Sequence, residues 1–218
     1  MEAISFTNNG KNASPQKQLE VLDMVRTIEK RNPPSPNLLS DPQEAQILDG
    51  TWYLHYTSPS DPGLIAAGES DQFPDAWKPQ QVEDKITTQK SGYKGSVSAA
   101  GIKVDTSNRV VQQILDVTNK SVTNKIDLDF GTVCVGGPFR QSEKVPNRAV
   151  VSFKQCDIAL KSGFVLKLGF LFSVLSFFRG TEESGWLETT YIDSTMRIGR
   201  GNKGTMFVLT RSSDDVKP

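Results

Sequence analysis

The N-terminal part of the chain carries the periodic pattern of an amphipathic helix. Its apolar residues recur every three positions and form one stripe, made of Leu19, Leu22, Val25 and Ile28. Ser14 is a suitable N-cap, and the prolines that begin at residue 33 end the pattern. The sequence therefore predicts a helix over residues 14–31, with its charged positions, Glu29 among them, in water. A short helical turn is also expected over residues 41–48.

After Gly50 the pattern changes to the alternation of apolar and polar positions that is typical of strands. We expect strands over residues 51–57, 81–89, 109–119, 122–130, 148–160, 186–193, 195–200 and 205–211. The apolar phase shifts within residues 148–160, which predicts a bulge there. Residues 58–79 are rich in proline and predict a long surface loop.

The number and order of these elements indicate the fold class. About eight strands in succession, separated by turn residues, predict a mainly β fold, an antiparallel β-barrel that closes on itself. The helix would bury its stripe against an end or the mouth of this barrel. We expect a single domain over residues 14–211, with the barrel at about residues 50–211 and disordered segments at residues 1–13 and 212–218.

Composition agrees with a globular domain and excludes some classes of protein. The chain has 218 residues, of which 36% are hydrophobic and 23% charged. Lys and Arg together number 25, as do Asp and Glu, and this zero net charge argues against a general nucleic-acid binder. No apolar run reaches the length of roughly 18 residues that a membrane-spanning helix needs. Residues 1–14 lack the apolar stretch of a secretory signal peptide.

Residues 164–178 form the most apolar segment, in which Lys167 is the only charged residue and five positions are phenylalanine. One interpretation is a buried core strand that runs into the barrel floor. The other is a lipid-facing surface, because an exposed apolar patch of this size needs a partner. The residues that would meet lipid in that case are Leu171, Phe172, Phe177 and Phe178.

The residues that often carry chemistry have structural explanations here. Residues 199–204 match G-x-G-x-x-G, but a strand follows them where a dinucleotide fold needs a helix, so we expect a tight hairpin. His55 is the only histidine and is expected to be structural or to line a cavity. Cys134 and Cys156 are expected to be free thiols, with a redox-responsive pair as the alternative. No set of nucleophile, base and orienting group is indicated, so we expect no catalytic site, metal or cofactor.

Several sequence motifs resemble those of a known family. Residues 48–57 read LDGTWYLHYT, residues 185–193 GWLETTYID, residues 196–204 MRIGRGNKG and residues 207–209 FVL. In this order they resemble the plastid lipid-associated protein (PAP), or fibrillin, family over about residues 15–211. The match departs from the family pattern at Ile192 and Met196, which stand where the family has leucine.

The resemblance implies a lipocalin-like barrel. In that superfamily a G-x-W tryptophan packs under the barrel with a late arginine across its indole, and Trp52 and Arg211 stand at the matching positions. The family's polar motif falls on Asp193, Arg197 and Arg200. We expect these three to form a structural ion pair across a hairpin, with a polar anchor for a ligand head group as the alternative.

The resemblance also implies a non-enzymatic plastid protein, without its transit peptide, at plastoglobules, thylakoids or in the stroma. Its ligand would be an isoprenoid, prenylquinone, carotenoid or fatty acid. The alternatives are a structural coat of lipid globules, or a partner of a lipid-biosynthetic enzyme. The candidate cavity residues are Tyr53, Val111, Leu115, Ile126, Leu128, Val151, Phe153, Leu187, Tyr191 and Phe207.

Overall fold

A computed structural model describes residues 1–59, 96–99, 102–105, 109–170, 184–201 and 205–211. Its helical elements are η1 (Glu2–Ile4), α1 (Pro15–Arg31), α2 (Pro42–Ala45) and η2 (Gln46–Leu48). Its strands are β1 (Gly50–Pro59), β2 (Ser96–Ala99), β3 (Ile102–Asp105), β4 (Val111–Asp116), β5 (Ser121–Leu128), β6 (Gly131–Gln141), β7 (Arg148–Ser152), β8 (Gln155–Leu160), β9 (Val165–Lys167), β10 (Ser184–Ile192), β11 (Met196–Gly201) and β12 (Thr205–Arg211).

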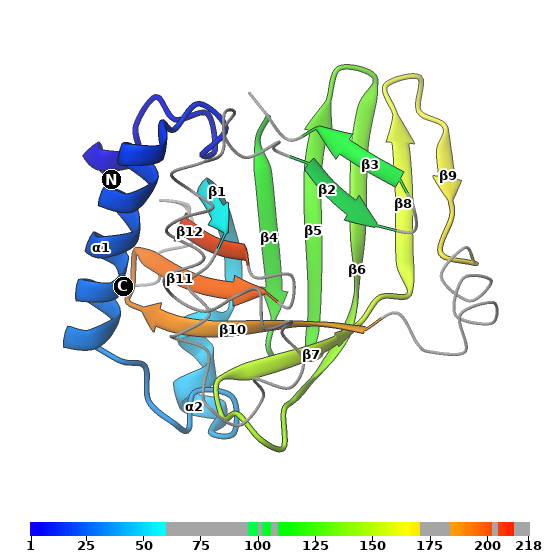
Figure 1. Ribbon diagram of the computed structural model, residues 1–218. Coiled ribbons are helices and arrows are strands. Elements are labelled where there is room, and N and C mark those ends of the chain that lie inside the picture. Colours follow the sequence, from blue (N-terminus) through cyan, green and yellow to red (C-terminus); the bar gives the residue numbers. More distant parts are fainter. Residues whose placement is uncertain (60–95, 100–101, 106–108, 171–183, 202–204, 212–218) are drawn as a thin grey trace.

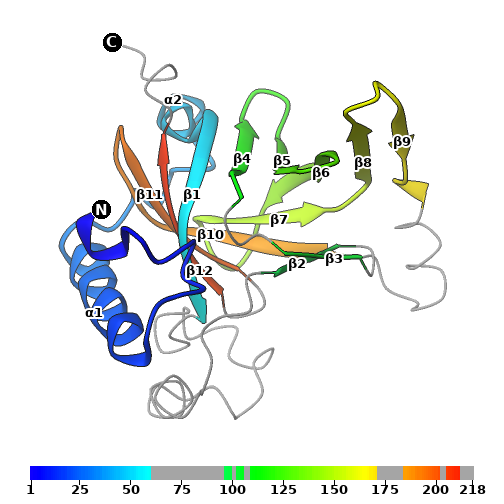
Figure 2. The same ribbon diagram turned by 90° about the horizontal axis from the view of Figure 1, so that it is seen from above.

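Eight antiparallel strands close into a barrel, as the sequence predicts. Their order is β5-β4-β1-β12-β11-β10-β7-β6, and β6 pairs back onto β5 to complete the ring (Figures 1 and 2). The other edge of β6 is shared, because residues 139–141 pair with β7 and residues 131–136 pair with β8. The β8–β9 hairpin therefore leaves the ring and extends the sheet to one side, while β2 and β3 form a separate two-stranded sheet.

Two expectations about the strands are wrong. The shift of apolar phase within residues 148–160 is not a bulge but a break, since β7 ends at Ser152 and β8 begins at Gln155 to pair with a different part of β6. The strand expected over residues 122–130 ends earlier, at Leu128, and Phe130 lies in the β5–β6 turn, where it is 55% exposed. The expected strand over residues 81–89 and the expected loop over residues 58–79 fall almost wholly outside the described residues.

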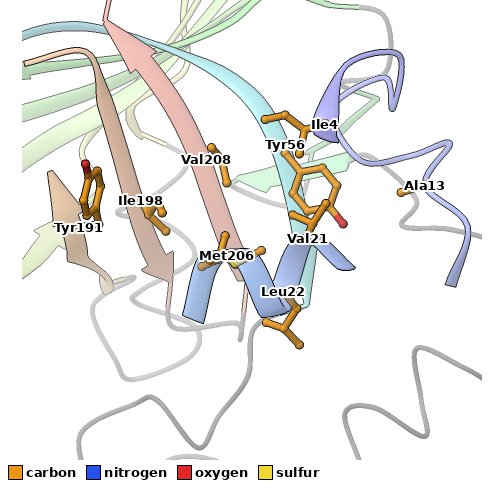
Figure 3. Close-up of a cluster of buried hydrophobic side chains, with 10 residues drawn as sticks. Ile4, Ala13, Val21, Leu22, Tyr56, Tyr191, Ile198, Met206 and Val208 are labelled. Atoms are coloured by element: carbon orange, nitrogen blue, oxygen red, sulfur yellow. The ribbon is translucent and has the colours of Figure 1, made fainter. Parts of the chain in front are cut away.

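The wall of the barrel has an apolar cluster on each face. The inner cluster is built around Trp52, Leu115, Val122, Phe139, Val151 and Leu209. Leu48 of η2 and Leu38, which precedes α2 in the chain, belong to the same cluster and close one end of the barrel. The outer cluster joins α1 to the outer wall through Val21, Leu22, Val25, Tyr56, Tyr191, Ile198, Met206 and Val208 (Figure 3).

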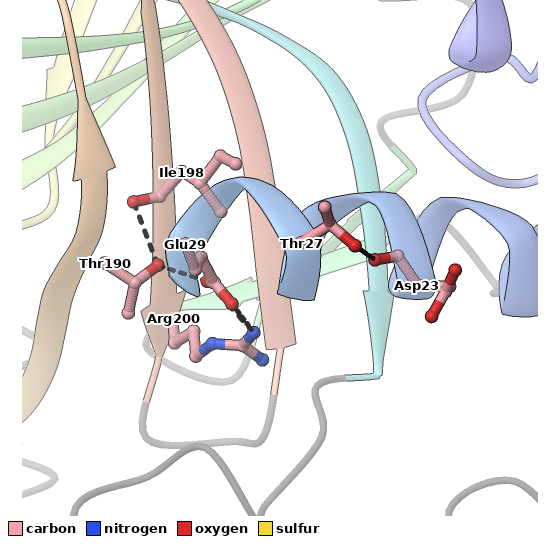
Figure 4. A network of polar contacts seen from close by, with 6 residues as sticks. All are labelled: Asp23, Thr27, Glu29, Thr190, Ile198 and Arg200. Atoms are coloured by element: carbon pink, nitrogen blue, oxygen red, sulfur yellow. Dashed lines mark hydrogen bonds and ion pairs between the residues drawn. The ribbon is translucent and has the colours of Figure 1, made fainter. Parts of the chain in front are cut away.

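Helix α1 therefore covers the outer wall over β10, β11 and β12, and not an end or the mouth of the barrel (Figures 1 and 2). The N-cap is as expected, because the Ser14 hydroxyl accepts a hydrogen bond from the Lys17 amide at 3.2 Å. The buried face is rotated relative to the expected stripe, however, and it includes Glu29. The physical reason is a partner for this carboxylate on the barrel, Arg200 at 2.7 Å (Figure 4).

The segment before α1 is folded, which differs from the expected disorder. Ile4, Thr7 and Ala13 are buried, and Asn9 forms a bridge with Tyr56 of β1. Gly10 has a φ of +92°, and a Cβ at this position would lie 2.1 Å from the carbonyl oxygen of Thr57. Only glycine allows such a close approach, so this segment is packed directly onto β1. The expected disordered tail at residues 212–218 lies outside the described part of the chain.

Candidate ligand site inside the barrel

Most of the candidate cavity residues share the inner face. Side chains alternate along a strand, and the pairing places each residue opposite another inward residue. The residues that face inward by this criterion, or pack against the inner clusters, are Val111, Leu115, Ile126, Leu128, Val151, Phe153, Leu187 and Phe207. The assignment of Tyr53 and Tyr191 to the cavity wall is wrong. Tyr53 stands between the inward residues Trp52 and Leu54 on β1 and therefore faces outward. Tyr191 belongs to the outer cluster under α1.

The barrel does not bury all of its own inward side chains. Leu54, Leu187 and Phe207 pack against the inner cluster or face inward, yet each is only partly buried. Gln113 and Asn124, which also point inward, are partly buried too. These residues are therefore not completely enclosed by the rest of the chain.

The closed end of the barrel is built around Trp52. Its indole Nε1 donates a hydrogen bond to the Leu48 carbonyl at 2.9 Å. The Arg211 guanidinium lies 4.3 Å from the ring centroid and donates to the carbonyl oxygens of Asp49 and Ile47. The structure thus places the tryptophan and the late arginine together, as the resemblance implies, and fixes the indole at the bottom of the interior.

Arg197 is the polar residue of the inner wall with the most unusual surroundings. It is 1% exposed, its guanidinium lies 5.3 Å from the Trp52 ring centroid, and it donates a hydrogen bond to Gln113 Oε1. Its Nε is buried and has no hydrogen-bond partner. Burial, and then the nearby charge of Arg211, lower the pKa of Arg197 to about 9.

Gln113 and Asn124 complete this polar group. Trp52, Gln113 and Asn124 stand in one row across β1, β4 and β5, and Gln113 Nε2 donates to Asn124 Oδ1 at 2.9 Å. Sequence reasoning missed both amides. The signal was available, because each one interrupts an otherwise apolar inward series, Val111–Leu115 on β4 and Val122–Ile126 on β5.

The other two residues of the polar motif have different roles, so the expected ion pair across the hairpin is wrong. The Asp193 carboxylate accepts hydrogen bonds from the Tyr191 hydroxyl at 2.6 Å and from the Thr195 and Met196 amides at 2.7 Å. It thereby holds the β10–β11 turn. Burial alone would raise the pKa of Asp193, but these hydrogen bonds outweigh it and lower the pKa.

Arg200 lies on the outer face, where it binds Glu29 of α1. The carboxylate of Glu29 also accepts a hydrogen bond from the Thr190 hydroxyl at 2.5 Å, which in turn contacts the Ile198 carbonyl (Figure 4). Both charges are nearly inaccessible to solvent. This pair anchors α1 to the barrel and does not face the interior.

The described part of the segment 164–178 is exposed. Phe164 and Phe170 are 62% and 60% exposed, and Val165 and Leu166 of the edge strand β9 are also exposed. The interpretation as buried core is therefore wrong for residues 164–167 and 170. Phe130 lies nearby, since its carbonyl accepts a hydrogen bond from the Lys161 amide in the β8–β9 hairpin. The candidate lipid-surface residues Leu171, Phe172, Phe177 and Phe178 lie outside the described residues.

The remaining candidates for chemistry have structural environments. The motif at residues 199–204 joins the directly paired strands β11 and β12, which confirms the hairpin. His55 Nε2 lies 2.8 Å from the Thr210 hydroxyl, and burial lowers the pKa of this histidine. Cys134 and Cys156 are free thiols whose pKa values are raised by burial, and they lie on opposite faces of the sheet. Among the described residues no group of His, Cys, Asp and Glu is arranged to hold a metal ion.

The fold and its closed end define a class of protein, a mainly β domain with a closed eight-stranded antiparallel barrel and an N-terminal helix. Comparison with known proteins narrows this class. The PAP_fibrillin family model matches residues 1–210, so the chain belongs to the PAP/fibrillin family. No solved structure matches the chain.

Several curated relatives come from plants. The chain is 29% identical over 231 residues to "Probable plastid-lipid-associated protein 3, chloroplastic" of Arabidopsis thaliana, with 99% of this chain and 57% of that protein aligned. It is 27% identical over 233 residues to "Plastoglobulin-1, chloroplastic" of Pisum sativum, covering 99% and 60%. It is 24% identical over 228 residues to "Light-induced protein, chloroplastic" of Solanum tuberosum, covering 99% and 66%. The chain thus spans about three fifths of the length of these relatives.

Proposed function

We propose that this chain is a non-enzymatic plastid lipid-associated protein that binds a small hydrophobic molecule inside its barrel. The observation that carries the proposal is the inner wall, which is apolar and yet only partly covered at Leu54, Leu187 and Phe207. Apolar side chains that solvent reaches inside a barrel are typical of sites for apolar ligands. The relatives named for plastid lipid and plastoglobules support the choice of a lipid and of the plastid.

The proposal does not include catalysis. The described inner wall presents the guanidinium groups of Arg197 and Arg211 and the amides of Gln113 and Asn124, which can orient a ligand. His55 contacts Thr210 and lies on the outer side of the wall. The ligand classes under test are isoprenoids, prenylquinones, carotenoids and fatty acids, and no cofactor is needed for binding any of them.

The first test is native mass spectrometry, with lipid extraction, of protein purified from plastids. One bound lipid per chain is the expected result. A matched pair of variants then locates the site. Leu187→Trp places bulk inside the barrel and is expected to weaken binding at least about tenfold, whereas Tyr53→Trp changes the outer face and retains binding. Equal effects of the two variants, or an empty protein, would contradict a site in the interior.

A second candidate function is attachment to a lipid surface, which the exposed residues Phe130, Phe164, Val165, Leu166 and Phe170 favour. With the exposed Lys161 and Lys167 they make up an apolar and basic patch around the β8–β9 hairpin, with residues on both faces of this sheet edge, and it is suited to an anionic lipid surface. Among the described residues, none of the helices has the length and apolar character needed to cross a bilayer.

Flotation with lipid globules tests this second function. Phe164→Asp is expected to reduce binding of the protein to globules, while Phe6→Asp removes a phenylalanine that is 98% exposed elsewhere and leaves binding intact. Loss of binding in both variants would show that general hydrophobicity, and not this patch, attaches the protein. The role as partner of a lipid-biosynthetic enzyme predicts co-purification with that enzyme after lipid has been removed.

A further inference from the structure

Among the described residues of the barrel, three arginines have side chains that are almost completely buried, and one of them differs from the other two. Arg148 binds Glu188 and Arg200 binds Glu29, each at 2.7 Å. Arg197 is equally buried, yet among the described residues it has no carboxylate partner. A buried charge without a counter-ion is strongly unfavourable, so proteins rarely keep one without a compensating ligand or role.

The position of Arg197 relative to the interior is the second observation. Arg148 and Arg200 lie on the outer face, whereas Arg197 lies on β11 between the inward residues Leu209 and Ile192. Its hydrogen-bond partner Gln113 is partly exposed, as is Asn124 beyond it. The two amides are therefore not completely enclosed, although the guanidinium itself is covered.

The chemistry of the neighbours is the third observation. Gln113 offers the guanidinium a neutral oxygen, although a glutamate at the same position would supply a full counter-charge with nearly the same shape. The Nε of Arg197 has no partner, and a guanidinium binds a carboxylate through two parallel hydrogen bonds. The neutral Gln113 therefore holds the guanidinium by a hydrogen bond but does not compensate its positive charge, which an anion could do.

Beyond this polar row the inner wall is apolar. The inward residues between the row and the β5–β6 turn include Val111, Ile126, Leu128 and Val133. Asn124 and Leu128 are four residues apart on β5, which corresponds to about 13 Å of strand. A ligand with a polar head at Arg197 would therefore have an apolar wall beside its chain.

We propose that Arg197 anchors the anionic oxygen head group of a single-chain lipid, with a carboxylate as the chemistry it fits best. This inference rests on the proposed function and makes it more specific. A lipid with an ionised head group satisfies the buried guanidinium, whereas a carotenoid or another neutral isoprenoid leaves it without a counter-ion. Gln113 positions the guanidinium, and the alkyl chain lies along the inner wall toward the β5–β6 turn.

The test is a competition titration on the full chain. Lipid-free protein is loaded with a fluorescent fatty-acid probe, which is displaced by hexadecanoic acid, hexadecanol or hexadecyl phosphate. The wild type is expected to bind the acid about 10- to 100-fold more tightly than the alcohol, the range for hydrogen bonds to a charged group. Tighter binding of either anion than of the alcohol supports the anchor, and the ratio of the two anions distinguishes carboxylate from phosphate.

Two variants and one control make the test specific to this residue. Arg197→Met is expected to bind the acid and the alcohol equally, and Gln113→Glu is expected to do the same because it supplies an internal carboxylate. Arg140→Met removes an exposed arginine on the outer face and should keep the preference for the acid. If Arg197→Met does not fold, the ratio of the affinities for acid and alcohol in the wild type, compared with the same ratio in Gln113→Glu, still tests the proposal.

The outcomes separate this inference from the proposed function. If the wild type binds hexadecanoic acid and hexadecanol with equal affinity, the anchor is refuted while the barrel remains a lipid site. If an anion preference exists but survives in both Arg197→Met and Gln113→Glu, another residue makes it and the assignment to Arg197 is refuted. If neither the acid, the alcohol nor the phosphate displaces the probe, and the probe itself does not bind, the proposed function fails as well.

Discussion

Replacement of Arg197 by methionine is expected to stabilise the lipid-free protein. Methionine keeps much of the length of the side chain and removes the buried charge. In the wild type, burial and then the charge of Arg211 lower the pKa of this arginine from its ordinary value to about 9. At about 1.4 kcal/mol for each pKa unit, this displacement corresponds to about 5 kcal/mol of unfavourable free energy for the charged form at neutral pH.

Two favourable contacts of the guanidinium offset part of this cost. The charged hydrogen bond to Gln113 contributes about 1.5–3 kcal/mol. The contact with the Trp52 ring, at 5.3 Å from its centroid, contributes about 0.5–2 kcal/mol. The net effect of Arg197→Met is then an increase of about 1 kcal/mol in the free energy of unfolding of the empty protein.

Urea denaturation of delipidated protein at pH 7 measures this difference. Arg200→Met is the matched comparison and is expected to lose about 3–5 kcal/mol of unfolding free energy, because it leaves Glu29 buried without its partner.

The unfavourable burial of the Arg197 charge also predicts a pH dependence of stability. As pH rises through about 9, the unfolded wild type keeps more protons than the folded one at this residue, so this contribution makes the wild type more stable. A loss of more than about 2 kcal/mol in Arg197→Met would show that the guanidinium is a structural element, and would refute the reasoning.

Three further changes test the packing around the site. Glu29→Gln is expected to destabilise the fold by about 3 kcal/mol, and the addition of Arg200→Gln should restore part of the loss in a double-mutant cycle of urea unfolding. The lowered pKa of Asp193 means that its carboxylate stabilises the fold above the ordinary value of 3.8 and loses this effect as pH falls below it, so Asp193→Asn should flatten the acid limb of a thermal-melting profile. Gly10→Ala, with a positive φ and a Cβ 2.1 Å from the Thr57 carbonyl, is expected to lower the melting temperature by at least several degrees, and an unchanged temperature would contradict the packing of the N-terminal segment on β1.

Elements with a strong local pattern were predictable, and those defined by long-range pairing were not. The helix and the strands β1, β5 and β12 follow from periodicity alone. The strand β6 was missed because Gly136, Gly137 and Pro138 interrupt its apolar pattern, although it is the strand that closes the barrel. Pairing with β5 on one side and with β7 and β8 on the other outweighs these weak strand formers, which no local window reveals.

The same distinction applies to the side chains of the site. The apolar inner wall and the Trp52–Arg211 pair could be expected from alternation and from the family resemblance. The orientation of the helix could not, since its buried face is set by an ion pair between residues 171 positions apart. Tyr191 was misplaced for a related reason, because an irregularity in the β10–β11 register between Thr189 and Tyr191 turns its side chain to the outer face.

The distribution of charge differs between the two faces of the barrel wall. On the outer face the buried arginines are matched by Glu29 and Glu188, so the charges are satisfied within the fold and serve to hold α1 and β7 in place. Helix α1 lies on this outer face, and therefore it neither fills nor covers the described interior. On the inner face Arg197 contacts the Gln113 amide and the Trp52 ring, and among the described residues it has no carboxylate partner. The proposed anionic head group would supply at Arg197 the counter-charge that Glu188 and Glu29 supply to Arg148 and Arg200 on the outer face.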